Sequence, residues 1–294
     1  MSAETADLRA TQQASEPPEL DPWSPRGIVH RGMFRGARLD TDHFRSATLL
    51  TAEQAGHFRA AADEILVANF RHAGRWFIAR VRLGAIEDLI FHLEWTGDRF
   101  PGVHNQLRVV MRDGDEVTLQ PQLPGEPDSS VRLKNILLSS EGNFAPGTAA
   151  RLRGGLEQAS ISHMAMSMEQ KAEIMSAGGT LHKVVQIPLL LTDDQKRDVV
   201  LRYLRHATEV GTDEMFNLLT WNCASPLFQV LDRSVDYGAV RNVLASFSPT
   251  FMPHWAPTNL ELRKIADKAR TLPDFFDEFP PSRAAATRNP GADV

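Results

Sequence analysis

Several residue types and patterns are scarce in this sequence, and each absence excludes a class of protein. The 294 residues contain one cysteine, which rules out a framework of intrachain disulfides and a zinc site made from several cysteines. No run reaches the roughly 18 apolar residues that a membrane-spanning helix needs. The net charge is −5 and the Lys and Arg residues are scattered, so we expect neither a membrane span nor a nucleic-acid partner.

Signatures of common cofactor and catalytic sites are also missing. There is no P-loop, no Gly-x-Ser-x-Gly elbow and no His-Glu-x-x-His pair. Carboxylate pairs such as Asp193-Asp194 fall at expected helix starts, where they favour the helix dipole over glycosidase chemistry. The Met-rich run 163–168, in an expected loop or helix start, favours packing over copper binding. We therefore expect no cofactor and no metal.

The two ends of the chain differ in composition from the middle. Residues 1–34 are rich in Ala, Ser, Glu and Pro and lack hydrophobic periodicity, which predicts a disordered leader, and residues 280–294 predict a disordered tail. The middle, 35–279, is expected to form a single domain, because 42% hydrophobic and 23% charged residues are typical of a soluble globular protein. The first residues are acidic and polar rather than a signal peptide, so we expect a cytoplasmic location.

The first half of the expected domain predicts one helix followed by strands. Thr51 and Gln54 form a capping-box pattern, and apolar residues recur at helical spacing as far as about Phe70, so a helix is expected over 51–70. The segment 112–115, Arg-Asp-Gly-Asp, is typical of a hairpin turn between two strands. Alternating apolar residues predict an antiparallel meander of strands at 76–83, 85–95, 103–111, 116–120 and 133–140.

Helices dominate the second half. Thr192 and Gln195 form another capping box before an apolar stripe, which predicts a helix over 192–209. The segment 183–189 predicts a strand, and Pro188 favours a sheet edge or a strand end. Together the elements predict an α+β fold, an antiparallel sheet with flanking helices. The other expected helices span 151–160, 167–175, 237–246 and 259–272.

The single cysteine lies in the segment 215–226, where a polar turn with Thr220 and Asn222 gives way to an apolar run. Thr or Asn before such a run is typical of a helix N-cap, which predicts that Cys223 lies in the first turn of a helix. A thiol there faces free backbone N–H groups and the positive end of the helix dipole, which favour the nucleophilic thiolate. The alternative is that Cys223 is a small, buried apolar residue.

A nucleophilic thiol needs a base, and histidine is the usual choice near neutral pH. Of the ten histidines, His104 follows a Phe-Pro-Gly turn at the start of an expected strand, so it is expected to project from the rim of the sheet. His92, within a strand, is the second candidate. Other histidines, including His57, His182 and His206, are expected to be surface or packing residues.

Two blocks of the sequence resemble a known family. The segment 216–223, Phe-Asn-Leu-Leu-Thr-Trp-Asn-Cys, is similar to the Asn-Cys motif of the Lnb N-terminal periplasmic domain family, with Phe216 in place of the usual Tyr. The segment 104–108, His-Asn-Gln-Leu-Arg, followed by Asp113-Gly114, resembles the histidine block of that family. The resemblance covers roughly residues 75–235 and implies a circularly permuted papain-like arrangement of the NlpC type.

The resemblance implies a role for each residue of a catalytic site. Cys223 is expected to be the nucleophile and His104 the base. Gln122 falls where the family often carries a Glu that fixes the imidazole, and Gln120 and Glu141 are reserves for that role. The name of the family implies export to the periplasm, whereas the start of this sequence predicts no export signal.

The expected function follows from the Cys-His pair. Asn222 is expected to cap the helix or to contribute to an oxyanion hole with the backbone N–H of Cys223. We expect a thiol hydrolase or acyltransferase acting on an amide, peptide or ester bond, with a small-molecule, peptide or acyl substrate of open identity. The alternative is a non-catalytic binding or chaperone-like module that retains the fold, which a thiol buried under Trp221 would favour. A purely structural cysteine is the third possibility.

Overall fold

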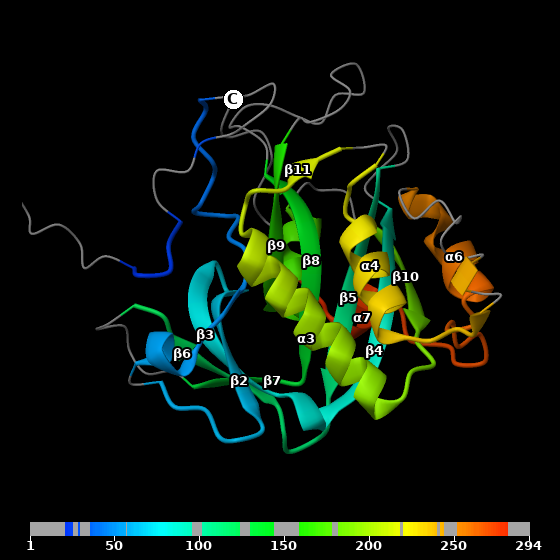
Figure 1. Cartoon of the computed structure of the whole chain (residues 1–294), viewed down its shortest axis with the longest axis horizontal. Helices are drawn as coiled ribbons and strands as arrows, with labels where there is room; N and C mark the ends of the chain where they lie inside the picture. The colour runs from blue at the N-terminus through cyan, green and yellow to red at the C-terminus, as the bar shows by residue number, and fades with distance from the viewer. Residues whose placement is uncertain are drawn as a thin grey trace, which may run out of the picture.

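The computed structural model describes residues 21–25, 29, 36–56, 58–95, 102–123, 130–143, 159–177, 182–217, 220–239, 242–243 and 252–281. Within these ranges, eleven strands join in one sheet (Figure 1). The long strands form where aliphatic and aromatic residues can pack on a pleated surface. The strands are β1 (Thr48–Leu49), β2 (Glu64–His72), β3 (Arg75–Arg82), β4 (Ile86–Trp95), β5 (Val103–Met111), β6 (Val117–Pro121), β7 (Val131–Leu133), β8 (Asn135–Asn143), β9 (Ala159–Ser167), β10 (Lys183–Pro188) and β11 (Met215–Phe216).

The sheet is mixed rather than purely antiparallel. Its order is β10-β4-β5-β8-β9-β2-β3-β6-β7, with β1 paired to β2 and β11 paired to β9. The pair β2 and β9 is parallel, which corrects the antiparallel sheet expected from the sequence. The sheet is mixed because β2, early in the chain, pairs with β9, which comes much later. Local turn signals in the sequence do not predict such a distant pairing.

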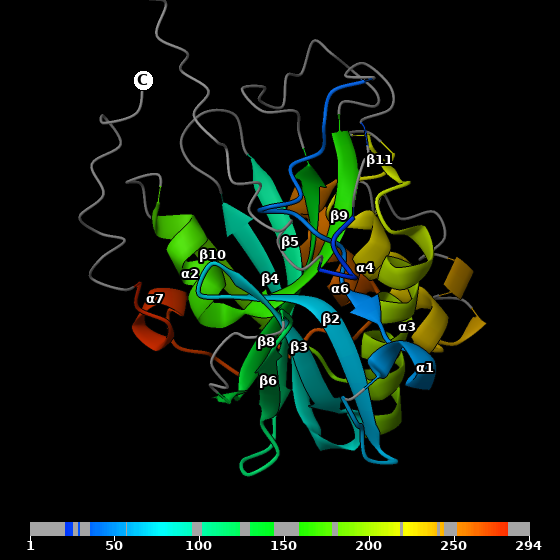
Figure 2. The same ribbon diagram turned by 90° about the vertical axis from the view of Figure 1, so that its left-hand side faces the viewer.

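Helices cover both faces of the sheet, which therefore forms the middle layer of three (Figure 2). One face is covered by α3 (Asp193–Val210) and α4 (Ser225–Ser234), and the other by α2 (Met168–Ser176) and α7 (Phe275–Glu278). The larger core lies under α3 and α4, while a second core under α2 and α7 contains Leu137 and Met164. Two shorter helices are α1 (Ala52–Ala55) and α6 (Ala256–Leu262).

Strand β8 supplies polar side chains to both faces because successive residues of a strand point in opposite directions. Ser139 and Glu141 face α2, where Lys171 lies 3.4 Å from the Glu141 carboxylate. Ser140 faces α3, where its hydroxyl lies 3.3 Å from the Tyr203 hydroxyl. The sheet therefore carries two separate polar clusters, one on each side of β8.

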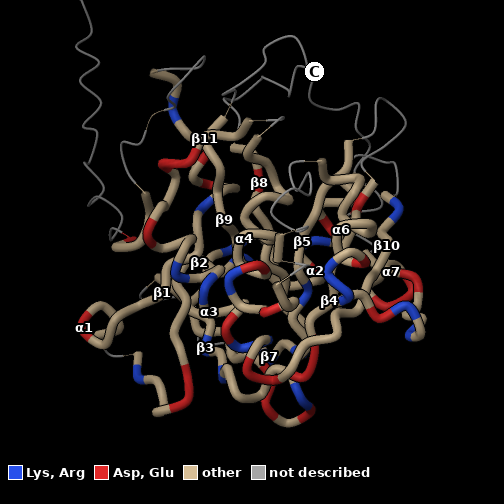
Figure 3. The backbone as a smooth tube through the Cα atoms, turned by 45° about the vertical axis from the view of Figure 1, so that its right-hand side comes forward, with Lys and Arg blue, Asp and Glu red and all other residues tan. Residues whose placement is uncertain are grey.

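Two further properties of the described chain are the distribution of its charges and the apolar character of its helices. Acidic and basic residues are interspersed along the described chain rather than gathered by sign (Figure 3). Among the described residues, no helix combines the length and the apolar character needed to cross a membrane.

The helix expected over 51–70 is wrong beyond its first turn. The capping box of Thr51 and Gln54 is present, but α1 contains only four residues. Gly56 follows with φ of 56°, a left-handed conformation that stops the helix. The apolar residues after it belong to β2, where Val67 and Phe70 are buried in the larger core. Pairing across the sheet therefore outweighs the helical spacing of the sequence.

The turn at 112–115 is present, but the hairpin expected around it is wrong. Gly114 has φ of 90°, as a tight turn of this kind requires. However, β5 pairs with β4 and β8, while β6 pairs with β3 and β7. The local sequence specifies the turn, whereas the apolar faces of distant strands decide the partners.

Most later elements agree with the sequence. The expected strands at 76–83, 85–95, 103–111 and 183–189 are confirmed within a residue or two, and Pro188 ends β10 at the sheet edge. The helix expected over 192–209 is confirmed as α3, with the capping box of Thr192 and Gln195 in place. The helix expected over 167–175 is confirmed as α2, capped by the Ser167 hydroxyl.

Three expectations in the second half need correction or lie outside the described residues. The Met-rich run was expected in a loop or helix start, but most of it belongs to β9. Residues 151–158 of one expected helix are outside the described residues, and 159–160 begin β9; the helix expected over 237–246 also lies partly outside. The helix expected over 259–272 begins earlier, as α6, and ends before Lys264, which has φ of 56°.

Part of the expected leader packs on the domain. Residues 1–20 and 282–294 lie outside the described residues. Asp21 forms an ion pair of 2.6 Å with Arg45, and Trp23 packs against the small core that contains Leu66 and Ile78. The boundary expected at residue 35 is therefore too late, because at least 21–25 contact the folded chain.

Candidate functional site

Cys223 lies just before α4 rather than in its first turn. The N-cap residue of α4 is Ala224, and no side chain caps it. Asn222 is fully buried, and its side-chain oxygen accepts a hydrogen bond of 3.0 Å from the Ala224 N–H. The Asn222 N–H in turn donates to the Ser225 hydroxyl at 3.3 Å. These bonds form a rigid turn that fixes the backbone on both sides of the thiol.

The thiol of Cys223 faces the beginning of β5. Its sulfur lies 3.8 Å from the carbonyl oxygen of Val103, the residue before His104, and only 5% of Cys223 is exposed. Cys223 lies close enough to His104 for its charge to raise the pKa of the imidazole. The structure thus brings together the cysteine and the histidine that the sequence selects.

A carboxylate holds the other side of His104. The His104 Nε2 lies 2.7 Å from the Ser139 hydroxyl and 3.1 Å from the Glu141 carboxylate. Ser139 donates to the same carboxylate at 2.8 Å, so all three groups form a closed set of contacts. Burial alone would lower the pKa of His104, but the negative charges of Glu141 and Cys223 raise it to about 10.

The side chain beside His104 is Glu141, one of the two reserves, and not Gln122, the first choice from the sequence. Gln122 is buried elsewhere: it accepts the Asn69 N–H at 2.7 Å and donates to the Asp21 carboxylate at 2.9 Å. Glu141 reaches His104 because β8 pairs with β5. Ser139 opposes Gln106 in that register, which places the next residue on the same face, Glu141, opposite His104.

His92, the second candidate base, is enclosed within the sheet and the layer of α7. It is fully buried, and its ring lies 5.8 Å from the Phe275 ring in an edge-on arrangement. Burial, with the nearby charge of Arg108, lowers the pKa of His92 to about 3, so the ring is neutral. Its surroundings are those of a packing residue.

A buried charge network extends from Glu141 to the edge of the sheet. The Lys171 amine lies 3.4 Å from the Glu141 carboxylate and 3.0 Å from the Glu94 carboxylate. His182 contacts Glu94 at 2.5 Å. Although burial opposes ionisation of Glu94, Lys171 and its hydrogen-bonding neighbours lower the pKa of this carboxyl to about 2. Burial likewise opposes the ionisation of Glu141, but His104 and Lys171 hold the pKa of that carboxyl well below its ordinary value.

Sequence reasoning missed Lys171 and Glu94. The sequence offers only a weak signal for them: Glu94 falls in an apolar strand and Lys171 in a short helix, where a charged residue is usually solvent-exposed. Their partnership depends on α2 packing against the face of the sheet that carries Glu94. No local pattern reports that contact.

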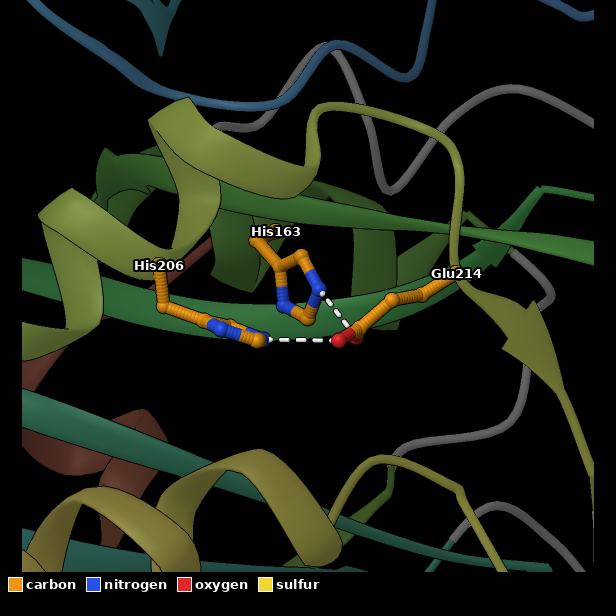
Figure 4. A group of neighbouring side chains, drawn as sticks. All are labelled: His163, His206 and Glu214. Atoms are coloured by element: carbon orange, nitrogen blue, oxygen red, sulfur yellow. Dashed lines mark hydrogen bonds and ion pairs between the residues drawn. The ribbon is translucent and has the colours of Figure 1, made fainter.

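A second cluster lies on the opposite face of the sheet. His163 of β9, His206 of α3 and Glu214, which precedes β11, point toward one another (Figure 4). Burial lowers the pKa of His163, so its ring is neutral near pH 7. Burial alone would raise the pKa of Glu214, but contacts with His163, His206 and the Trp221 indole lower it. The Trp221 side chain is therefore held on this cluster, next to the turn that carries Cys223.

Comparison with known proteins found no matching family model, no matching curated protein and no matching solved structure. The chemistry of the site therefore rests on its own side chains. Within the described residues, the charge of Cys223 acts on His104, and the His104 ring contacts the Glu141 carboxylate.

Proposed function

We propose that this chain is a thiol hydrolase or acyltransferase that acts on an amide, peptide or ester bond, with a permuted papain-like arrangement. The observation that supports the proposal most is the position of His104 between Cys223 and Glu141. A nucleophile, a base and a group that orients the base are the three parts that thiol catalysis uses. The three residues come from elements that are distant in the sequence, so their proximity is not simply that of chain neighbours.

The charges around His104 favour an imidazolium at this position. With a pKa of about 10, His104 carries its proton at neutral pH. Its Nε2–H is held by Ser139 and Glu141, which leaves the other ring nitrogen to exchange a proton with Cys223. Glu141 stabilises the positive ring, a contribution that a neutral Gln at this place would lack.

The proposed reaction has two steps. The Cys223 sulfur attacks the carbonyl carbon, a C–S bond forms, and His104 protonates the departing amine or alcohol as its bond to carbon breaks. In the second step, water or an acceptor amine or alcohol gives its proton to His104 and attacks the thioester. The acyl group leaves as an acid, or as a new amide or ester, and the thiolate is restored.

The backbone at the turn supplies a donor for the developing oxyanion. The Asn222 N–H and the Ala224 N–H are already engaged with the Ser225 hydroxyl and the Asn222 side chain. The N–H of Cys223 lies between them and is the donor that we assign to the tetrahedral intermediate. Asn222 then acts as the residue that fixes this turn rather than as an acid or a base.

The low exposure of the thiol favours one alternative. Cys223 is 5% exposed and its sulfur contacts the Val103 carbonyl, which suits a module that retains the fold for binding without turnover. The two functions differ in one measurable respect. A hydrolase forms a covalent acyl intermediate on Cys223, and a binding module does not.

Acylation by an activated ester tests the proposal. We expect p-nitrophenyl acetate to give a burst of p-nitrophenol and one acetyl group on Cys223, located by peptide mass spectrometry. Cys223→Ser and His104→Ala should lose the burst, while His182→Asn, a matched histidine of the same charge network, should keep it. Absence of an acyl group on Cys223 in the wild-type chain would reject the enzyme and leave the binding module.

A further inference from the structure

The cluster on the α3 side of the sheet has the composition of a metal site. It contains two imidazoles and one carboxylate: His163 of β9, His206 of α3, and Glu214 of the segment between α3 and β11 (Figure 4). We propose that these three side chains bind one divalent transition-metal ion, with Zn²⁺ the best match. Imidazole and carboxylate ligands suit Zn²⁺, and three protein ligands leave a further position for water.

The distances between ligand atoms suit a single ion. The Nε2 of His163 lies 3.0 Å from Glu214 Oε2, and the Nε2 of His206 lies 3.1 Å from Glu214 Oε1. The three ligand atoms all lie within 4.8 Å of one another. Zinc–nitrogen bonds of about 2.0–2.1 Å in a tetrahedral site separate ligand atoms by about 3.3 Å. Small side-chain rotations are therefore sufficient to surround an ion.

The nitrogen of His206 that faces the cluster has no aligned hydrogen-bond partner. Its Nε2 is buried, and although Glu214 is near, the geometry is not that of a hydrogen bond to any described residue. A buried polar nitrogen without a partner is costly, because it has lost its hydration. A metal ion placed between His206 and Glu214 would supply the missing partner.

Neighbouring side chains form hydrogen bonds with two of the proposed ligands, as residues around a metal site commonly do. The far ring nitrogen of His163, Nδ1, lies 2.9 Å from the Ser140 hydroxyl, which is itself 3.3 Å from the Tyr203 hydroxyl. The Trp221 indole N–H donates to Glu214 at 2.7 Å. Such contacts fix the orientation of a ring and of a carboxylate, and metal ligands commonly have them.

An ion here would connect β9, α3 and the segment that leads to the thiol. Glu214 precedes β11, and the chain then returns through Trp221 to Cys223. The metal site does not rest on the proposed catalysis, because neither Cys223 nor His104 belongs to it. In this proposal the ion links Glu214, which also holds the Trp221 indole, to β9 and α3.

Metal titration of the full chain tests the site. The chain is stripped with a chelator, dialysed and titrated with Zn²⁺ by calorimetry, and Co²⁺ is used to obtain a visible spectrum. We expect one equivalent to bind and, at a free concentration of 100 times Kd, the Tm to rise by roughly 5–10 °C. His206→Gln and Glu214→Gln should weaken binding by more than the roughly 10–100-fold that loss of an outer partner costs.

Matched variants separate this site from other places that bind zinc. His43→Gln alters an exposed histidine that lies 2.9 Å from Asp40, and it should leave the affinity unchanged. Cys223→Ser should also leave it unchanged. Circular dichroism of each metal-free variant checks its folding, and Glu214→Gln decides the question if His206→Gln does not fold.

Two results would overturn the metal site. One is a wild-type chain that binds no stoichiometric Zn²⁺ or Co²⁺. The other is binding that survives both His206→Gln and Glu214→Gln but is lost in Cys223→Ser, which would place the ion on the thiol and His104. Acylation of Cys223 is measured separately, by the p-nitrophenyl acetate experiment on the metal-free chain.

Discussion

Replacement of Lys171 by methionine tests the buried charge network most severely. The Lys171 side chain is 5% exposed and lies between two carboxylates, Glu94 at 3.0 Å and Glu141 at 3.4 Å. Methionine keeps most of the apolar stem but removes the charge. The variant therefore leaves the buried Glu94 carboxylate with His182 and the partly buried Glu141 carboxylate with His104.

The structure gives the size of the effect. Removing one partner of a buried ion pair costs about 3–5 kcal/mol, because the remaining charge has lost its compensation. The pKa of Glu94, about 2 against an ordinary value of 4.5, is the net result of burial, Lys171, His182 and His104, so it agrees in direction with a stabilising Lys171. We predict that Lys171→Met lowers the free energy of unfolding by about 3–5 kcal/mol at pH 7.

The effect has a defined pH dependence. The folded-state pKa of Glu94 lies below its unfolded value, so its contribution to stability is present above about pH 4.5 and is lost as the pH falls through about 2. In Lys171→Met the carboxyl takes up a proton more readily. The difference in stability between variant and wild type should therefore be full at pH 7 and smaller at pH 3.

Urea unfolding followed by circular dichroism measures both quantities. The matched control is Lys134→Met, which breaks an exposed ion pair with Asp113 and should cost less than about 1 kcal/mol. A cost for Lys171→Met no greater than that for Lys134→Met would refute the reasoning. A penalty that is unchanged at pH 3 would also refute it.

Two further predictions concern the parts of the fold that surround the site. Gln122→Leu should lower the unfolding free energy by about 1–3 kcal/mol, because the buried Asn69 N–H loses its acceptor, yet alkylation of Cys223 should stay at the wild-type rate. A large decrease in the alkylation rate of Cys223 would instead indicate that Gln122 belongs to the catalytic site. Thr192→Ala should lower the unfolding free energy by about 1 kcal/mol, because it removes the cap of α3. Thr51→Ala at the four-residue α1 should lower it by less. Thermal melting compares the two variants, and equal losses of stability would contradict a dependence on helix length.

Local sequence patterns predict helices and strands correctly where tertiary contacts favour the same secondary structure. The capping boxes at Thr51 and Thr192 are both present, but only the second begins a long helix. After Thr192 an apolar stripe packs on the sheet, whereas after Thr51 the chain meets Gly56 and then enters a strand. The same local signal therefore has different outcomes, because tertiary pairing competes with helical spacing.

The site was predictable in part. The sequence selects Cys223 and His104 from the position of each beside a turn and from the Asn-Cys resemblance. The carboxylate beside His104 could not be chosen without the pairing of β8 with β5, and counting from the turn led to Gln122 instead of Glu141. Pairing partners are set by contacts between distant segments, so a count along the chain does not determine them.

The cluster of His163, His206 and Glu214 shows the same limit. Its members lie on a strand, a helix and a turn, without the close spacing by which metal ligands are found in a sequence. His163 also falls in the Met-rich run that we expected in a loop or helix start. Only the placement of α3 over β9 brings the three side chains together.

The rate at which Cys223 is alkylated between pH 5 and pH 10 tests the proposed dyad most directly. A small haloacetamide is used because the thiol is 5% exposed, and His104→Ala and His182→Asn are compared with the wild type. We predict that at pH 6 His104→Ala reacts at least about tenfold more slowly than the wild type, and that its rate rises with pH like that of an ordinary thiol with a pKa of about 8.5. His182→Asn should follow the wild type. A wild-type profile that coincides with that of His104→Ala would contradict the dyad.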